Sequence, residues 1–114
     1  MKAKEEVVLT PIQERALKAL RERLFAEFEL VDLILFGSVV RGEADAESDI
    51  DLLVMTPQPL ARRARHEITD VVFEVNLRYD TNFSTLVVDR ESWTSGVFSV
   101  LPLHEEVLRE GVVL

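Results

Sequence analysis

The chain has 114 residues, of which 47% are hydrophobic and 30% charged, with no cysteine and a formal net charge of -8 at pH 7. This length supports one domain, residues 1–114, and the absence of cysteine excludes disulfides and thiolate metal sites and fits a cytoplasmic protein. No apolar run approaches the roughly 20 residues of a membrane span, the charged N-terminus is unlike a signal peptide, and the acidic balance argues against non-specific nucleic-acid binding.

Hydrophobic periodicity and turn residues predict alternating helices and strands. The first helix is expected to begin after Thr10, an N-cap candidate that precedes Pro11 at the first helical position, with Gln13 placed to complete a capping box. Helices are predicted over about 11–28, 60–79 and 101–110, strands over about 31–36, 49–55 and 83–88, and a short strand or packing tail over 112–114. This order predicts an α/β (α+β) fold with a small mixed sheet of three to five strands flanked by helices.

Polar residues gather where the first predicted strand ends and the second begins. Gly37-Ser38 closes the first apolar run, and Asp49 and Asp51 open the second. Side chains two apart in a strand point to the same face, so both carboxylates project together while Ile50 faces the core. Such a pair suits Mg²⁺, and a glycine turn with a serine hydroxyl suits phosphate. The alternative is structural, a tight turn followed by charges that protect a sheet edge from aggregation.

Gly37-Ser38 followed after ten residues by Asp49-x-Asp51 resembles the signature of the DNA polymerase beta-like nucleotidyltransferase superfamily. Within it, the chain is most similar to the minimal nucleotidyltransferases that prokaryotes often encode beside HEPN-domain proteins. The resemblance covers nearly the whole chain. The supporting residues are Arg41-Gly42, Ala44, Ser48 and the closing Glu110-Gly111-Val112-Val113-Leu114.

The resemblance implies a role for each residue of the motif. Asp49 and Asp51 are expected to be catalytic and to hold Mg²⁺ or Mn²⁺. Gly37 and Ser38 are expected to hold the β- and γ-phosphates of a nucleoside triphosphate. Ser48 is expected in the nucleotide site, and Arg41 either contacts phosphate or braces the loop through Glu43 or Asp45.

The resemblance further implies transfer of a nucleoside monophosphate, expected to be AMP from ATP, to a hydroxyl group. The expected acceptor lies on a HEPN toxin, which the modification silences. A different class of function stays open, a nucleotide-binding antitoxin that neutralises HEPN by contact alone. A small-molecule transferase ranks last because it usually carries an added helical domain. A homo-oligomer is compatible with the sequence.

One carboxylate of the family pattern is missing. The resemblance implies a third acid on the strand after the second predicted helix, and counting back from Trp93 assigns its position to about Ser84. A hydroxyl is a poor Mg²⁺ ligand beside a carboxylate, so this departure puts full activity in doubt. The possible substitutes are Asp89, which is also expected to cap a following helix, Asp80, a turn residue, and Glu74, a helix-surface residue.

A basic cluster near the start of the second predicted helix has two interpretations. It is either a solvated face or a contact to a nucleotide phosphate or an acidic partner. The residues concerned are Arg62, Arg63 and Arg65.

Overall fold

The computed structural model describes residues 6–43 and 49–114. Within these two stretches, no helix combines the length and hydrophobicity that a membrane span requires. The elements in chain order are α1 (Pro11–Glu27), β1 (Asp32–Phe36), β2 (Ile50–Thr56), α2 (Arg62–Tyr79), β3 (Phe83–Asp89), α3 (Arg90–Thr94), the 3₁₀-helix η2 (Val97–Val100), α4 (Pro102–Glu110) and β4 (Val112–Val113).

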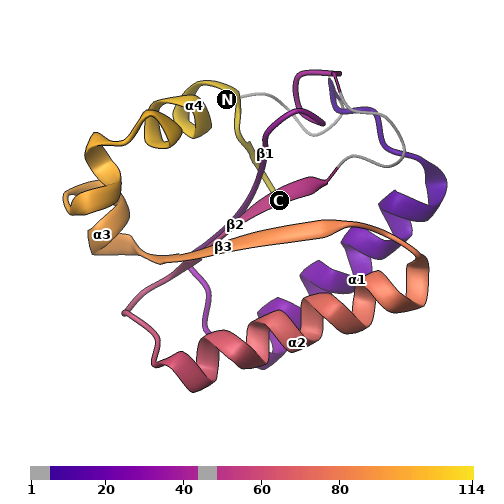
Figure 1. The fold of residues 1–114 in the computed structure, drawn as a ribbon, viewed down its shortest axis with the longest axis horizontal. Coiled ribbons are helices and arrows are strands. Elements are labelled where there is room, and N and C mark those ends of the chain that lie inside the picture. Colours follow the sequence, from indigo (N-terminus) through magenta and orange to yellow (C-terminus); the bar gives the residue numbers. More distant parts are fainter. Residues whose placement is uncertain (1–5, 44–48) are drawn as a thin grey trace.

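The strands form one mixed sheet in the order β3-β2-β1-β4 (Figure 1). β1 is antiparallel to both β2 and β4, whereas β2 and β3 are parallel. The parallel pair is joined by α2, as a crossover connection requires. The predicted mixed sheet flanked by helices is therefore confirmed, and residues 112–113 form a strand.

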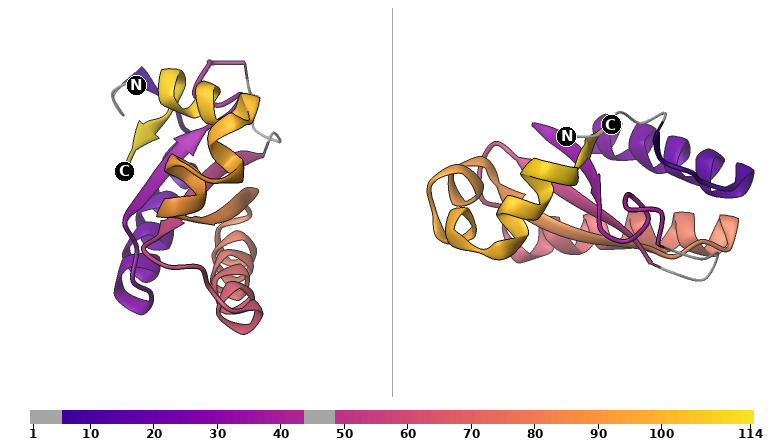
Figure 2. Two further views of the ribbon diagram at one scale, coloured as in Figure 1. Left: turned by 90° about the vertical axis from the view of Figure 1, so that its left-hand side faces the viewer. Right: turned by 90° about the horizontal axis from the view of Figure 1, so that it is seen from above.

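Helices cover both faces of the sheet. α1 and α2 lie side by side against one face, and α3, η2 and α4 lie against the other (Figure 2). The alternation of β2 explains how two layers form: Ile50, Leu52 and Val54 belong to the core beneath α1 and α2, whereas Leu53 and Met55 belong to the core beneath α3 and α4. Every second residue of β2 therefore faces α3 and α4.

The predicted start of α1 is confirmed. The Thr10 hydroxyl accepts a hydrogen bond from the Gln13 N–H at 3.1 Å, and the Gln13 side-chain oxygen accepts one from the Thr10 N–H at 2.9 Å. This capping box fixes where the helix begins. The residues buried on its inner face are Ala16, Leu17, Leu20 and Leu24.

Asn76 joins the end of α2 to the start of β3. Its Oδ1 accepts hydrogen bonds from the Phe83 N–H at 2.8 Å and the Thr81 hydroxyl at 3.1 Å, and its Nδ2 donates to the Phe83 carbonyl at 3.0 Å. One amide side chain thus satisfies both backbone groups of the first residue of β3. It helps to set the position of β3 beside β2.

We expect Asn76→Ala to lower the free energy of unfolding by roughly 1–3 kcal/mol, because it leaves backbone groups of partly buried residues without their partners. Urea denaturation followed by circular dichroism measures this loss. Thr69→Ala, on the same helix, is the control, since the exposed Thr69 hydroxyl bonds only to the Arg65 carbonyl one turn earlier. Equal losses in the two variants would contradict a special role for Asn76.

Candidate active site

Asp51 lies on the face of the sheet that α3 and α4 cover. It is the second residue of β2, between Ile50 and Leu52, both of which are buried on the opposite face. The expectation that Ile50 faces the core while Asp51 points the other way is therefore met. Asp49 directly precedes the strand, and its charge acts on Asp51. The two acids thus lie close enough to repel each other.

The turn that follows β1 lies against Asp51. Phe36 pairs with Asp51 in the antiparallel register, so Gly37 leaves the sheet beside the acid. Gly37 has φ +88°, and a Cβ at this position would overlap the Asp51 Oδ2 and lie 3.2 Å from its Cγ. Glycine is therefore required both for the backbone conformation and for the approach of the carboxylate.

Residues 37–42, named here the glycine turn, hold their shape through backbone hydrogen bonds. The N–H groups of Val40, Arg41 and Gly42 each donate to the carbonyl three residues earlier, at 3.1–3.3 Å. Within the described residues, the N–H groups of Ser38 and Val39 donate no hydrogen bond. Like the first amides of a helix, they are free to meet an anion.

Arg41 connects the glycine turn to α4. Its Nε donates to Glu43 at 3.0 Å, and its Nη1 donates to Glu106 at 2.7 Å and to Glu110 at 3.3 Å. These hydrogen bonds raise the pKa of the guanidinium well above its ordinary value. The expectation that Arg41 braces the loop through Glu43 is met, whereas Asp45 lies outside the described residues.

The two α4 acids were not foreseen from the sequence. Glu106 and Glu110 lie one turn apart, an i,i+4 spacing that puts both on one side of the helix. This spacing was a signal that could have suggested a shared cation. With Arg41 they border a hollow of about 550 Å³, which Pro102, Glu105 and Arg109 complete.

The electrostatics of the site favour a cation. Burial raises the pKa of the Asp51 carboxyl, the charges of Asp49 and Glu106 raise it further, and Arg41 lowers it. Each raising effect disfavours the ionised carboxylate, and a bound divalent ion would relieve all of them.

Ser84 occupies the neighbouring position on β3. The parallel register pairs it with Asp51, so both side chains point to the same face of the sheet, and Ser84 is exposed. This pairing agrees with the count back from Trp93. Over residues 6–43 and 49–114, no three His, Cys, Asp or Glu side chains are grouped closely enough to hold a metal ion. The site therefore offers two carboxylates and a hydroxyl.

The possible substitutes for the third acid serve other purposes. Asp89 pairs with Thr56 at the far end of β3 and caps α3, accepting hydrogen bonds from the Ser92 N–H at 3.0 Å and hydroxyl at 2.7 Å, as expected. Asp80 ends α2 with φ 55°, and Glu74 pairs with Arg23 at 2.6 Å. None of the three reaches the position beside Asp51.

The remaining predicted residues lie elsewhere or outside the description. Ser48 and Ala44 fall in the stretch that the structure does not describe. Arg62, Arg63 and Arg65 begin α2, which follows the end of β2 opposite to Asp51, and all three are exposed. Their position favours the solvated-face interpretation.

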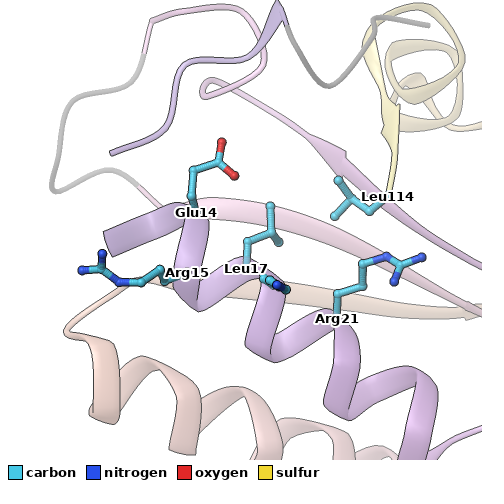
Figure 3. Close-up of a pocket in the computed structure, with 6 residues that line it drawn as sticks. Glu14, Arg15, Leu17, Arg21 and Leu114 are labelled. Atoms are coloured by element: carbon cyan, nitrogen blue, oxygen red, sulfur yellow. The ribbon is translucent and has the colours of Figure 1, made fainter. Parts of the chain in front are cut away.

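A second hollow, of about 440 Å³, lies on the α1 side of the molecule (Figure 3). Leu17 and Leu114 form its apolar wall, and Glu14, Arg15, Lys18 and Arg21 surround it. It lies across the sheet from Asp51, so it is separate from the paired acids.

The chain is similar to proteins of a known family. The family described as "Nucleotidyltransferase domain" matches residues 15–92. Two proteins of Methanocaldococcus jannaschii whose names contain the term protein adenylyltransferase are similar to the chain. MJ1305 is 37% identical over 87 residues, covering 75% of this chain and 58% of its own length, and MJ0141 is 31% identical over 68 residues, covering 60% and 69%. The chain thus spans little more than half of MJ1305.

Solved structures share the fold. One whose name is that of a minimal nucleotidyltransferase superposes with a TM-score of 0.58 at 26% identity, covering 90% of this chain and 92% of the other. A toxin–antitoxin crystal structure with AMP-PNP gives a TM-score of 0.56 at 24% identity, covering 91% and 72%. Since the family match extends over more than half of the chain and includes the glycine turn, Asp49, Asp51 and Ser84, the chain belongs to the nucleotidyltransferase domain family.

Proposed function

We propose that the protein transfers AMP from ATP to a hydroxyl group of a HEPN-domain partner in the cytoplasm, and that it thereby acts as an antitoxin. The observation that carries the proposal is the position of Asp51, which has the glycine turn on one side and Ser84 on the other. The protein adenylyltransferase names of the relatives and the AMP-PNP in a toxin–antitoxin neighbour support the choice of AMP and of a protein acceptor.

The chain's own residues supply binding and orientation. The free amides at the start of the glycine turn and the Ser38 hydroxyl would hold the β- and γ-phosphates, and the close packing of Gly37 on Asp51 keeps them near the paired acids. The acceptor oxygen would bond to the α-phosphorus as the bond to the β-phosphate oxygen breaks. Pyrophosphate leaves, and the hydroxyl proton passes to solvent. Positioning of this kind can supply much of the acceleration.

Asp49 and Asp51 fit a divalent cation. They provide oxygen ligands, and Asp51 is a partly buried carboxylate whose neighbours disfavour its charge. These two residues would hold Mg²⁺ or Mn²⁺, which when bound would neutralise negative charge on the phosphates. Residues 1–114 would form a single catalytic domain.

The test is incubation with α-³²P-labelled ATP, Mg²⁺ and the protein encoded by the neighbouring gene, which we expect to be a HEPN-domain protein. Label on the partner, together with loss of its toxicity, is the expected result. Label from γ-³²P-labelled ATP would instead indicate phosphoryl transfer and would contradict the proposal.

The hydroxyl of Ser84 beside Asp51 favours a second candidate, an antitoxin that binds its partner without modifying it. A tight complex that neutralises the toxin without label transfer, and that forms equally well with Asp49→Asn and Asp51→Asn, would support this candidate.

Ser84→Asp distinguishes an impaired metal site from a site that needs no third acid. An acid there would face the same side as Asp51, so we expect it to tighten Mn²⁺ binding about tenfold, by adding an anionic oxygen ligand. Titration of Mn²⁺ followed by electron paramagnetic resonance measures the change. Ser84→Asn is the neutral control, and equal affinities in the two variants would show that position 84 does not face the metal.

A further inference from the structure

We propose that Arg41 is a positioning residue of the nucleotide site, which neutralises Glu106 and Glu110 of α4 rather than binding phosphate itself. The inference rests on the proposed function, because it concerns how ATP is held. It replaces the expectation that Arg41 contacts a phosphate. Three observations support the inference: the hydrogen bonds of the guanidinium, the net negative charge around it, and its place in the glycine turn.

The guanidinium already has its partners. Three carboxylates surround it, and its Nη1 is shared between Glu106 and Glu110. One positive and three negative groups leave this cluster with a net charge of -2. A triphosphate that approached Arg41 would meet this net negative charge, and repulsion by the carboxylates opposes a direct contact.

The same carboxylates lie near the paired acids. Glu106 accepts a hydrogen bond from Arg41 of the glycine turn, and Gly37 of the same turn lies against the Asp51 carboxylate, so α4, the turn and Asp51 adjoin on one face of the sheet. Without Arg41, Glu106 and Glu110 would add uncompensated negative charge where ATP is to be held. Arg41 thereby makes an acidic helix compatible with an anionic substrate.

The position of α4 is set independently of Arg41. Val107, between the two acids in sequence, is fully buried in the core that Ile34 and Leu53 also form. This packing brings Glu106 and Glu110 to the glycine turn, 65 and 69 residues away from Arg41 in sequence. Two acids held there by the fold require a cation, and Arg41 provides it.

The experiment measures the dissociation constant of Mg²⁺–AMP-PNP by isothermal titration calorimetry for the wild type, Arg41→Gln, the double variant Glu106→Gln/Glu110→Gln, and the triple variant that combines all three changes. Glutamine keeps the shape and a hydrogen-bonding oxygen but removes the charge. We expect Arg41→Gln to weaken binding about tenfold at low salt and much less at 0.5 M salt, because salt screens the partly exposed carboxylates of Glu106 and Glu110. We expect the triple variant to return to within about threefold of the wild type.

The matched control is Arg109→Gln, which removes one positive charge from the same helix. Arg109 is 66% exposed and its nearest acid oxygen is 3.9 Å away, so we expect less than a twofold change in affinity. If Arg109→Gln weakened binding as much as Arg41→Gln, the net charge of the protein alone would determine the affinity for Mg²⁺–AMP-PNP. This result would overturn the inference.

Direct phosphate binding predicts a different pattern. In that case the triple variant would bind as weakly as Arg41→Gln, and this result would refute the positioning role. If Arg41→Gln does not fold, as judged by thermal melting, the triple and double variants still differ only at position 41. Equal affinities of the double and triple variants would support the neutralising role of Arg41. A weaker affinity of the triple variant would support direct contact between Arg41 and phosphate. A wild type that binds no AMP-PNP would instead refute the proposed function together with this inference.

Discussion

Asp51→Asn is expected to lower AMP transfer by at least about 10²-fold and, at neutral pH, to raise the melting temperature. The loss of activity follows from the proposed function, in which the change removes one of two anionic ligands that would neutralise the reacting phosphates through a cation. The gain in stability follows because the native site disfavours the Asp51 charge. A residue that costs stability where it sits is typical of a functional position.

The effect of Asp51→Asn on stability depends on pH. The pKa of Asp51 is raised in the folded protein, so as pH rises above the unfolded value of about 3.9 the unfolded chain loses its proton first and gains stability relative to the fold. The destabilisation by the Asp51 charge grows as the pH rises from the unfolded pKa to the folded pKa, and it is complete above the folded pKa. The stabilising effect of Asp51→Asn should therefore be full above the folded pKa and vanish below about pH 4.

Thermal melting from pH 3 to pH 8 measures this dependence, and Asp89→Asn provides a control of opposite sign. Hydrogen bonds from the Ser92 hydroxyl and N–H lower the pKa of Asp89, so its charge stabilises the fold at neutral pH. Asp89→Asn should lower the melting temperature at pH 7, and the loss should fade on acidification. A destabilised Asp51→Asn at pH 7, or one with full transfer activity, would contradict the assignment of Asp51.

Mg²⁺ should raise the melting temperature of the wild type and not of Asp51→Asn, because a ligand that binds only the folded state stabilises it. A Mg²⁺ effect that survives Asp51→Asn would point to a different cation site.

Local sequence patterns predicted most of the fold. The capping box at Thr10, the apolar runs of β1 and β2, and the turn before Phe83 each contain their own signal within a few residues, and the structure contains the elements that they predict. Strand alternation also set Ile50 and Asp51 on opposite faces. The 3₁₀-helix at 97–100 has no counterpart among the predicted elements, since a single turn has too few residues for a periodic pattern.

The candidate site was predicted only where it is local. Gly37, Ser38, Asp49 and Asp51 come from two strands that pair directly, so their proximity follows from the connection between them. Glu106 joins them only because α4 packs on that face of the sheet, and no spacing along the chain shows this. The same packing decides whether Arg41 faces a carboxylate or solvent.

Gly37→Ala is expected to impair both folding and transfer, whereas Gly42→Ala should affect stability alone. Both glycines have positive φ, +88° and +72°, so alanine costs each of them about 1 kcal/mol of backbone strain. A Cβ at Gly42 would meet nothing within 4 Å, so backbone strain accounts for the whole loss of stability in Gly42→Ala. A Cβ at Gly37 would in addition overlap the Asp51 carboxylate. The comparison separates conformational strain from the displacement of the Asp51 carboxylate, the proposed metal ligand.

The cost of the overlap between a Cβ at position 37 and the Asp51 carboxylate can be measured separately in an Asp51→Ala background. That change removes the Oδ2 and Cγ that the new Cβ would meet, so the cost of Gly37→Ala, measured by urea denaturation, should fall to about that of Gly42→Ala. A cost of Gly37→Ala that stays the same in both backgrounds would show that the glycine serves its backbone conformation only. Transfer assays on Gly37→Ala then complete the argument: because the turn and the carboxylate occupy adjoining space, moving either one should reduce activity to the level of Asp51→Asn.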